Sequence, residues 1–412
     1  MNTKKLITYL SIPMVLIGIG LIVWNSSTEK AKVESVDTND TTEDAGESAT
    51  VEIPTETKEE LTAYQKAVER DPDNALGWNR LGALLLQTGE LAQAEEAFRK
   101  VLALSEAHQD KKEQAWAYSN LGDVYDRRGE SDKAEEMYRK ALEIDKALDS
   151  KQGMARTYTN LGNIYGRRGE LDRAEDMHRK ALEIDQALSI KENVADDYAN
   201  IGLVYDTRGE LDKAEEMYGK ALEINEALGN KEDLTDDYST LGNLYGRRGE
   251  RGKAEEMYRK ALEIDQALGI KENVADDYTS LGNVYTDPDK AEEMFQKALE
   301  IHQTLDSKQG MAEDYTNLGS LYYKLGDLDR AEDMHLKALD FDKALGNKEN
   351  MAQDYGTLGL VYYAGEDLDK AEEVWKKSLS LYEEIGAMQG NDARKVQQAL
   401  NNLAVLRSVF NK

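Results

Sequence analysis

Few side chains in this 412-residue sequence are of the types that perform catalysis or bind metals. It contains no Cys and only four His. Without thiols, the chain can form neither disulfides nor Cys-ligated zinc or iron–sulfur sites. The four His are scattered along the chain, whereas a metal site needs ligands that converge. We therefore predict that the protein holds no metal and no cofactor.

Adjacent glutamates are the best candidates for acid–base chemistry. They recur in nearly every copy of a repeated pattern, so a solvated helix face explains them better than catalysis does. The pairs are Glu135-Glu136, Glu215-Glu216 and Glu255-Glu256. No copy carries a unique carboxylate pair of the kind that a glycosidase needs. The sequence also lacks a nucleophile elbow, a phosphate loop and a dinucleotide fingerprint. We predict no catalytic residue and no enzyme activity.

The charge and the aromatic content constrain the remaining classes. The chain carries 52 Lys and Arg against 81 Asp and Glu, a net charge of −29. Such a charge argues against a nucleic-acid-binding protein, because the surface would repel phosphates. The composition includes 22 Tyr beside only 4 Phe. This bias indicates that one local pattern has been copied many times.

The N-terminus predicts a membrane anchor. Residues 6–24 form an uncharged run, and a helix of that length spans roughly 28 Å, about the thickness of the hydrocarbon core. Lys4 and Lys5 precede the run and acidic residues follow it. The positive-inside rule then places residues 1–5 in the cytoplasm and the rest of the chain outside, in a bacterium most simply in the periplasm. A cleaved signal peptide is the alternative, but the end of the run fits a cleavage site poorly.

Residues 25–58 are expected to be a flexible acidic linker. They are rich in Ser, Thr, Asp and Glu, and they contain no aromatic residue. Such a segment cannot bury enough apolar surface to offset the entropy lost on ordering. We interpret it as a solvated tether.

The rest of the chain is a repeat. The phrase Leu-Gly-x-x-Tyr, with Ile once in place of Leu, recurs every 40 residues with one step of 37. Its copies begin at Leu121, Leu161, Ile201, Leu241, Leu281, Leu318 and Leu358. The short step coincides with Asp287-Pro288-Asp289, which replaces the usual turn. Because the unit recurs without a long insertion, a separate catalytic domain is not expected.

Each unit predicts two amphipathic helices. Tyr118, Leu121 and Tyr125 are spaced as one face of a helix, and Gly129-Glu130 then supplies a turn. A second apolar stripe begins at Ala134. Small residues in both helices are expected to let the two backbones approach closely. Three glycines after a Leu are expected to be C-caps: Gly229, Gly269 and Gly346.

This pattern resembles the tetratricopeptide repeat family. The family positions are filled, in order, by Tyr158, Leu161, Gly162, Tyr165, Ala174, His178 and Ala181. The 40-residue period is similar to the repeats of kinesin light chains and of scaffolds that bind GoLoco-type regulators, although no kinesin or G-protein role is implied. The resemblance implies an all-α, right-handed solenoid over residues 59–391. A half repeat at 59–74 precedes full repeats that start near 75, 115, 155, 195, 235, 275, 312 and 352, and residues 392–412 form a capping helix.

The resemblance also implies which residues face the concave side. Amides there can both donate to and accept from the backbone of an extended peptide. The candidate amides are Asn120, Asn160, Asn163, Asn200, Asn243, Asn283 and Asn317. A basic edge is expected from Arg127, Arg167 and Arg247, and an acidic edge from Asp196, Asp236 and Asp276. These side chains could instead bind a neighbouring helix or face solvent.

These observations favour a membrane-tethered scaffold that binds protein or peptide partners in its concave groove. One alternative is a self-associating solenoid that organises an envelope complex. A repeat-supported enzyme is a weaker alternative, because no insertion could hold the chemistry. The sequence does not identify the partner or the oligomeric state.

Overall fold

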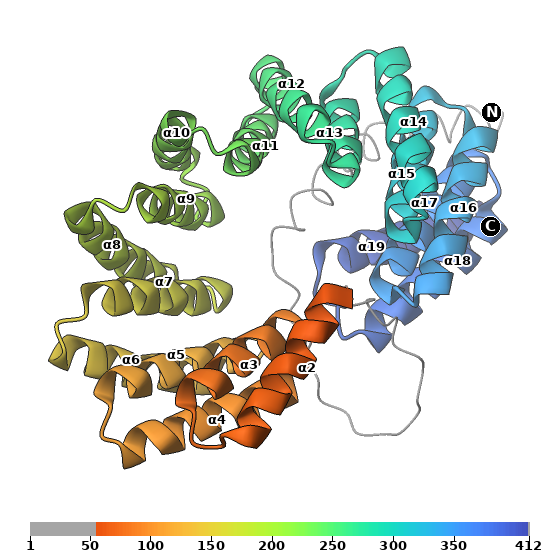
Figure 1. Cartoon of the computed structure of the whole chain (residues 1–412). Helices are drawn as coiled ribbons and strands as arrows, with labels where there is room; N and C mark the ends of the chain where they lie inside the picture. The colour runs from red at the N-terminus through yellow and green to blue at the C-terminus, as the bar shows by residue number, and fades with distance from the viewer. Residues whose placement is uncertain (1–54, 411–412) are drawn as a thin grey trace. The chain divides into compact units, whose positions relative to one another are not determined.

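A computed structural model describes residues 55–410, and every regular element among them is an α-helix. These residues form two compact units, the N-terminal unit (55–229) and the C-terminal unit (230–410) (Figure 1). The N-terminal unit contains α2 (Thr55–Arg70), α3 (Ala75–Gln87), α4 (Leu91–Ala107), α5 (Lys111–Arg127), α6 (Ser131–Ala147), α7 (Lys151–Arg167), α8 (Leu171–Leu188), α9 (Lys191–Thr207) and α10 (Leu211–Leu228). The C-terminal unit contains α11 (Lys231–Arg247), α12 (Arg251–Leu268), α13 (Lys271–Val284), α14 (Pro288–Leu305), α15 (Lys308–Leu325), α16 (Leu328–Leu345), α17 (Lys348–Ala364), α18 (Leu368–Glu384) and α19 (Asn391–Phe410).

The helices α3 to α18 form antiparallel pairs, one pair per repeat, as the sequence predicts. We call the odd-numbered members of these pairs, α3 to α17, the first helices, and their even-numbered partners the second helices. The turn within a pair is closed at Gly129, whose φ of 73° suits a residue without a Cβ atom. The amide of Glu130 then donates to the carbonyl of Tyr125 over 2.9 Å. The predicted C-caps Gly229, Gly269 and Gly346 also have left-handed backbones. The stacked pairs confirm an all-α solenoid.

Within each unit the first helices form one layer and the second helices form another (Figure 1). In the N-terminal unit, α3 contacts α5, α5 contacts α7 and α7 contacts α9; in the C-terminal unit, α15 contacts α17. Successive second helices approach one another less closely among the described residues. Unequal spacing of two layers curves a solenoid toward its tighter layer. The first helices therefore line the concave side of each unit.

A glycine in each first helix accommodates a ring from the second helix. A Cβ atom on Gly122 would lie 2.5 Å from Cε1 of Tyr138, which is buried. Gly162 makes the same room for His178. The sequence predicts that small residues let the two backbones approach closely. The structure shows that the glycine instead makes space for a side chain of the second helix. The same pairing occurs in Gly82/Phe98, Gly202/Tyr218, Gly242/Tyr258, Gly282/Phe295, Gly319/His335 and Gly359/Trp375.

The short repeat lies where the sequence predicts it. Helix α13 ends at Val284, and Asp287 caps the next helix by accepting from the amide of Asp289 over 3.1 Å. Pro288 occupies the first turn of α14, where its fixed φ and missing N–H are tolerated. The early proline therefore shortens the first helix and leaves the stacking of the pair intact.

The interpretation of the glutamate pairs as a wholly solvated face is wrong for Glu135. Glu135 is 7% exposed, and its Oε1 accepts from the hydroxyl of Tyr165, in the next first helix, over 2.6 Å. Arg168 pairs with the same carboxylate at 2.5 Å. We call each such Tyr–Glu contact between successive repeats a latch. Further latches are Tyr125–Glu95, Tyr205–Glu175, Tyr322–Glu292 and Tyr362–Glu332. Glu136, in contrast, is exposed.

Two N-terminal predictions fall outside the structure. The expected membrane span at residues 6–24 lies before the described residues, as does most of the expected linker at 25–58. Helix α2 begins at Thr55, slightly before the expected start of the half repeat at residue 59. Among residues 55–410, none of the helices combines the length and the apolar character that a bilayer crossing requires.

At the other end, α19 packs on α17 and α18. Its residues Val396 and Leu403 share a core cluster with Trp375 of α18. The last helix pair therefore has its apolar face covered by a helix that lacks the repeat signature.

Candidate functional site

The predicted amides all lie on first helices, and they differ in how far the protein already uses them. Asn120 of α5 is 8% exposed, and its Nδ2 donates to Oδ1 of Asn79 on α3 over 3.1 Å. Asn160 of α7 donates to Asp123 of α5 over 3.1 Å. Both amides therefore hold adjacent first helices together, which was the alternative to peptide binding. Asn243 of α11 accepts from the hydroxyl of Tyr258 over 2.7 Å and is exposed.

The remaining four amides form no side-chain hydrogen bond with another residue of the described segment. They are Asn163, Asn200, Asn283 and Asn317, and each is half-buried. An amide of this kind keeps two donors and one acceptor for a ligand. These four side chains are the best-placed candidates for contacts with a bound peptide.

The charged candidates are divided in the same way. Arg127 donates to the carbonyl of Leu86 over 2.7 Å, and Arg167 forms an ion pair with Asp126. These two guanidinium groups therefore tie successive first helices together. Arg247 is half-buried on α11. The acidic candidates are all exposed on first helices and are Asp196, Asp236 and Asp276.

A cation–aromatic pair on the N-terminal unit was missed by the sequence analysis. Cζ of Arg156 on α7 lies 5.2 Å from the ring centroid of Trp116 on α5, and the Trp116 side chain is 46% exposed. Nε of Arg156 is buried and makes no hydrogen bond within residues 55–410. The two residues occupy the same repeat position, which holds Asp196 in α9. A comparison of the copies at that position could have found the pair.

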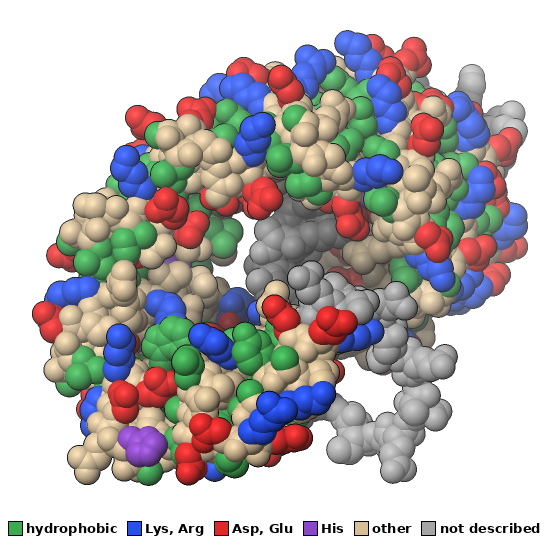
Figure 2. Space-filling view, in the orientation of Figure 1, with side chains coloured by type: hydrophobic (Ala, Val, Ile, Leu, Met, Phe, Trp, Pro, Cys, Tyr) green, Lys and Arg blue, Asp and Glu red, His purple; other side chains and the backbone are tan. Residues whose placement is uncertain are grey.

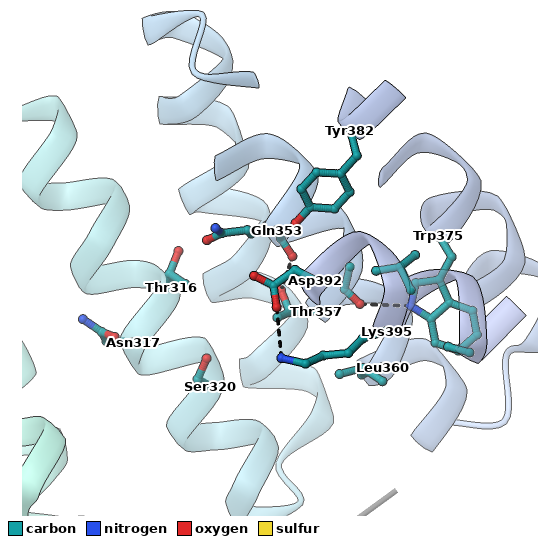
Figure 3. Close-up of a pocket in the computed structure, with 13 residues that line it drawn as sticks. Thr316, Asn317, Ser320, Gln353, Thr357, Leu360, Trp375, Tyr382, Asp392 and Lys395 are labelled. Carbon is teal, nitrogen blue, oxygen red and sulfur yellow. Dashed lines mark hydrogen bonds and ion pairs between the residues drawn. The ribbon is translucent and has the colours of Figure 1, made fainter. Parts of the chain in front are cut away.

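A pocket in the C-terminal unit was also missed. It has a volume of about 90 Å³ and is lined by α15, α17, α18 and α19 (Figure 3). Helix α15 contributes Asn317, the one predicted site residue in it. The other polar lining residues are Thr316, Ser320, Gln353, Thr357, Tyr382, Asp392 and Lys395. The pocket exists because α19 packs against α17 and α18. No spacing in the sequence reveals that contact.

Several polar groups of the pocket are already paired. Trp375 Nε1 donates to the carbonyl of Gly356 over 3.0 Å, and Lys395 donates to Asp392 over 3.0 Å. The hydroxyl of Tyr382 differs, since it is buried and has no hydrogen-bond partner within residues 55–410. Burial, followed by the nearby carboxylates of Asp392 and Glu349, raises the pKa of Tyr382. The phenol is therefore neutral and able to donate.

Buried carboxyl pairs lie where a second helix meets the next first helix. Burial and then the neighbouring Asp185 raise the pKa of Asp197 to about 7. Burial and then Asp265 raise the pKa of Asp277 to about 8. In a third copy His replaces the second-helix Asp, and His302 Nδ1 lies 2.6 Å from an oxygen of Asp314. Within residues 55–410, no three His, Asp or Glu side chains are arranged to hold a metal ion.

The surface provides no further concentrated charge on the face shown in Figure 2. Acidic and basic side chains are interspersed over the visible parts of both units. Many are i,i+4 pairs along second helices, such as Lys140 with Glu136 at 2.7 Å. Exposed pairs of this kind contribute little to stability. They keep the convex layer soluble and leave the first helices as the layer with distinctive chemistry.

The fold is that of a helical-repeat protein, a class suited to protein–protein interaction. Its marks are the stacked helix pairs, the glycine under each ring and the capping helix. The chain belongs to the tetratricopeptide repeat family. The model of that family matches residues 73–147, 153–227, 238–304, 273–344 and 310–384, which is more than half of the chain. A search of the curated proteins found no match to the sequence.

Solved structures with the same fold include sensors. The STAND protein PH0952 of Pyrococcus horikoshii, which has a tetratricopeptide repeat sensor, is 20% identical with a TM-score of 0.60, over 71% of this chain and 46% of that chain. The quorum sensor NprR of B. thuringiensis is 15% identical with a TM-score of 0.57, over 79% of this chain and 98% of that chain. BtubC (BKLC) of P. vanneervenii is 30% identical over 53% of this chain and 92% of its own, with a TM-score of 0.47. At 15–20% identity the likeness of the first two shows the fold alone.

Proposed function

We propose that this protein is a membrane-tethered scaffold that binds segments of partner proteins along its first-helix layers. The observation that carries the proposal is the set of four half-buried amides without a hydrogen-bond partner within residues 55–410: Asn163, Asn200, Asn283 and Asn317. Two lie in each unit on successive first helices, Asn163 and Asn283 at one position of the repeat and Asn200 and Asn317 at another. Amides on neighbouring first helices can donate to and accept from the backbone of one extended segment.

The tether rests on the N-terminal sequence. The uncharged run at residues 6–24 anchors the chain in the bilayer, and the acidic segment that follows gives the repeats reach. Because Lys4 and Lys5 precede the run, the N-terminus stays in the cytoplasm and the repeats lie on the opposite side, in the periplasm of a bacterium. The scaffold thus recruits partners outside the cytoplasm.

Site-specific photo-crosslinking tests the binding surface. A photoreactive amino acid is placed at Asn163 or Asn283 in the full chain, and the matched controls are Glu183 and Glu263, which are exposed on second helices. We expect crosslinked partners from the first-helix positions and at least fivefold less product from the controls. Equal product from both layers, or none from the first-helix positions, would refute the proposal.

The orientation has a separate test. Because the chain has no Cys, a single Glu183→Cys substitution gives one thiol for labelling. A membrane-impermeant maleimide added to intact cells with a permeable outer layer should label it without lysis. Labelling that requires lysis would place the repeats on the cytoplasmic side and contradict the proposed tether.

A further inference from the structure

One buried polar group of the C-terminal pocket, the hydroxyl of Tyr382, lacks a hydrogen-bond partner within residues 55–410. Tyr382 is 4% exposed. In Figure 3 its phenol points toward Gln353 and Asp392, into the space beside α15. Buried polar groups are almost always satisfied in folded proteins. A buried donor facing a cavity therefore indicates a group that a ligand completes.

The repeat pattern shows that this hydroxyl is particular to the last repeat. The equivalent second-helix position is Asp265 in α12, His302 in α14 and Asp342 in α16. In α14 that side chain bonds to the next first helix, through His302 and Asp314 at 2.6 Å. After α18 comes the capping helix α19, whose Asp392 lies in the same pocket but forms no hydrogen bond with Tyr382. The pocket thus arises where the stacking pattern ends.

The residues that line the pocket favour an uncharged ligand. Leu360, Val396 and Ala399 provide apolar contacts around the indole of Trp375. The two charged lining residues, Asp392 and Lys395, neutralise each other, and an ionic ligand would have to break that pair. A neutral side chain would leave the pair intact and avoid burying an unpaired charge.

The volume of the pocket favours a single side chain as the ligand. The volume of about 90 Å³ is smaller than the roughly 150 Å³ of a closed cavity that holds benzene, so this partly open pocket takes the end of one side chain rather than a larger molecule. A phenol ring has seven non-hydrogen atoms, and it combines an apolar body with a hydroxyl at its end. The apolar body matches Leu360 and Val396, and the hydroxyl can reach Tyr382 or Gln353.

We propose that this pocket binds one tyrosine side chain of a partner segment, with its hydroxyl bonded to Tyr382. The inference rests on the proposed function, since it assigns part of the peptide specificity to one place on the C-terminal unit. Asn317 and Ser320 on α15 lie at the same pocket, so the backbone of the segment continues along the first-helix layer.

The test uses p-cresol, the side chain of tyrosine, and toluene, which has the same shape without the hydroxyl. Binding to the full chain in detergent is measured by saturation-transfer NMR. We expect saturable p-cresol binding at millimolar concentration and at least tenfold weaker binding of toluene. Equal binding of the two probes, or no saturable p-cresol binding, would overturn the proposal.

Two variants locate the site. Tyr382→Phe deletes only the hydroxyl and should reduce the preference for p-cresol to less than twofold. Its melting temperature should not fall, because that hydroxyl bonds to no described residue. Ser320→Leu fills the pocket and should weaken p-cresol binding at least tenfold. Its matched control is Thr207→Leu, at an exposed position on the first helix α9, which should leave p-cresol binding unchanged.

The outcomes separate the two proposals. The p-cresol measurement needs no partner, so crosslinking could fail while the pocket still binds its probe. Conversely, p-cresol binding that survives Ser320→Leu would overturn the pocket assignment and leave the crosslinking result untouched. Lower stability of Tyr382→Phe would show that the hydroxyl already has a partner, and it would also overturn the assignment.

Discussion

The two units are built from one repeat, yet their first-helix layers carry different chemistry. The same repeat position is Trp116 in α5 and Arg156 in α7, but Asp236 in α11 and Asp276 in α13. In α9 of the N-terminal unit this position is also an Asp, Asp196. The N-terminal unit therefore adds a cation stacked on an indole, and the C-terminal unit adds a neutral pocket. Buried positions are dictated by the stacking, whereas exposed positions on the first helices are free to vary. In a copied repeat, differences in ligand preference are therefore found at the exposed positions.

The largest expected effect tests whether the two units share their packing. Gly122→Val puts a side chain where the ring of Tyr138 lies, and Gly282→Val does the same to Phe295. Each should lower the free energy of unfolding by about 3 kcal/mol, because neither ring has room to move. In variants whose other three Trp are replaced by Phe, Trp116 emission reports the N-terminal unit, and Trp375 emission reports the C-terminal unit.

The control is Gly219→Ala, at a helical glycine with open space around its Cβ position. It should raise the free energy of unfolding by about 0.5–1 kcal/mol through helix propensity. If Gly122→Val is tolerated as well as Gly219→Ala, the ring-and-glycine packing is wrong.

The second effect is a dependence on pH that arises from the buried carboxyl pairs. The pKa of Asp277, raised to about 8, lies above the ordinary Asp value, so the folded state binds this proton more tightly than the unfolded state. Stability from this site is therefore complete below about pH 4 and is lost as the pH rises toward 8. The slope is about 1.4 kcal/mol per pH unit within that window.

Asp277→Asn should flatten this dependence and raise the unfolding midpoint in urea at pH 8. Asp197→Asn should do the same in the N-terminal unit up to about pH 7. The exposed neighbour Asp276→Asn is the matched control and should change the profile much less. Identical profiles for wild type and Asp277→Asn would contradict the shared burial of these acids.

The latches give a smaller effect of opposite pH sense. Tyr165→Phe removes a 2.6 Å bond to Glu135, and Tyr362→Phe removes a 2.7 Å bond to Glu332. Each should cost about 1–1.5 kcal/mol in unfolding free energy. The control Tyr198→Phe loses only an exposed bond from Gln186 and should change stability by less than about 0.5 kcal/mol.

Acid should weaken the latches. Burial alone would raise the pKa of Glu175, but hydrogen bonds from Arg208, Tyr205 and Arg179 outweigh it and lower this pKa to about 2. Its contribution is present above about pH 4.5 and is lost as the pH falls toward 2. A Glu175→Gln variant whose acid unfolding matches the wild type would show that this latch does not contribute.

The sequence could predict most of the fold and only part of the site. The spacing of Leu121, Gly122 and Tyr125 predicts a helix face because helical periodicity is local. The burial of Glu135 could not be predicted in this way, since it depends on Tyr165 and Arg168 of the next repeat. The pocket depends on α15 and α19 both contributing residues to its lining, and those helices are separated by more than sixty residues in the sequence. Local patterns thus predict elements, and contacts between repeats decide which polar residues remain available.

The smallest expected effect concerns the contrast between the two first-helix layers. It tests whether Arg156 is held against Trp116 or merely adds a charge to the N-terminal layer. Arg156→Gln removes the guanidinium over Trp116 and should lower stability by about 0.5–1 kcal/mol, the usual size of an exposed cation–π contact. It should also shift the emission of Trp116 and leave that of Trp375 unchanged. Asp276→Asn, at the same repeat position in the C-terminal unit, should shift neither. If Arg156→Gln leaves Trp116 emission and stability unchanged, the cation is not held against the indole, and the N-terminal layer differs from the C-terminal layer in charge alone. If both change, the N-terminal layer presents a preorganised cation, and a carboxylate of a partner segment could bind it without first paying the entropy of ordering the arginine.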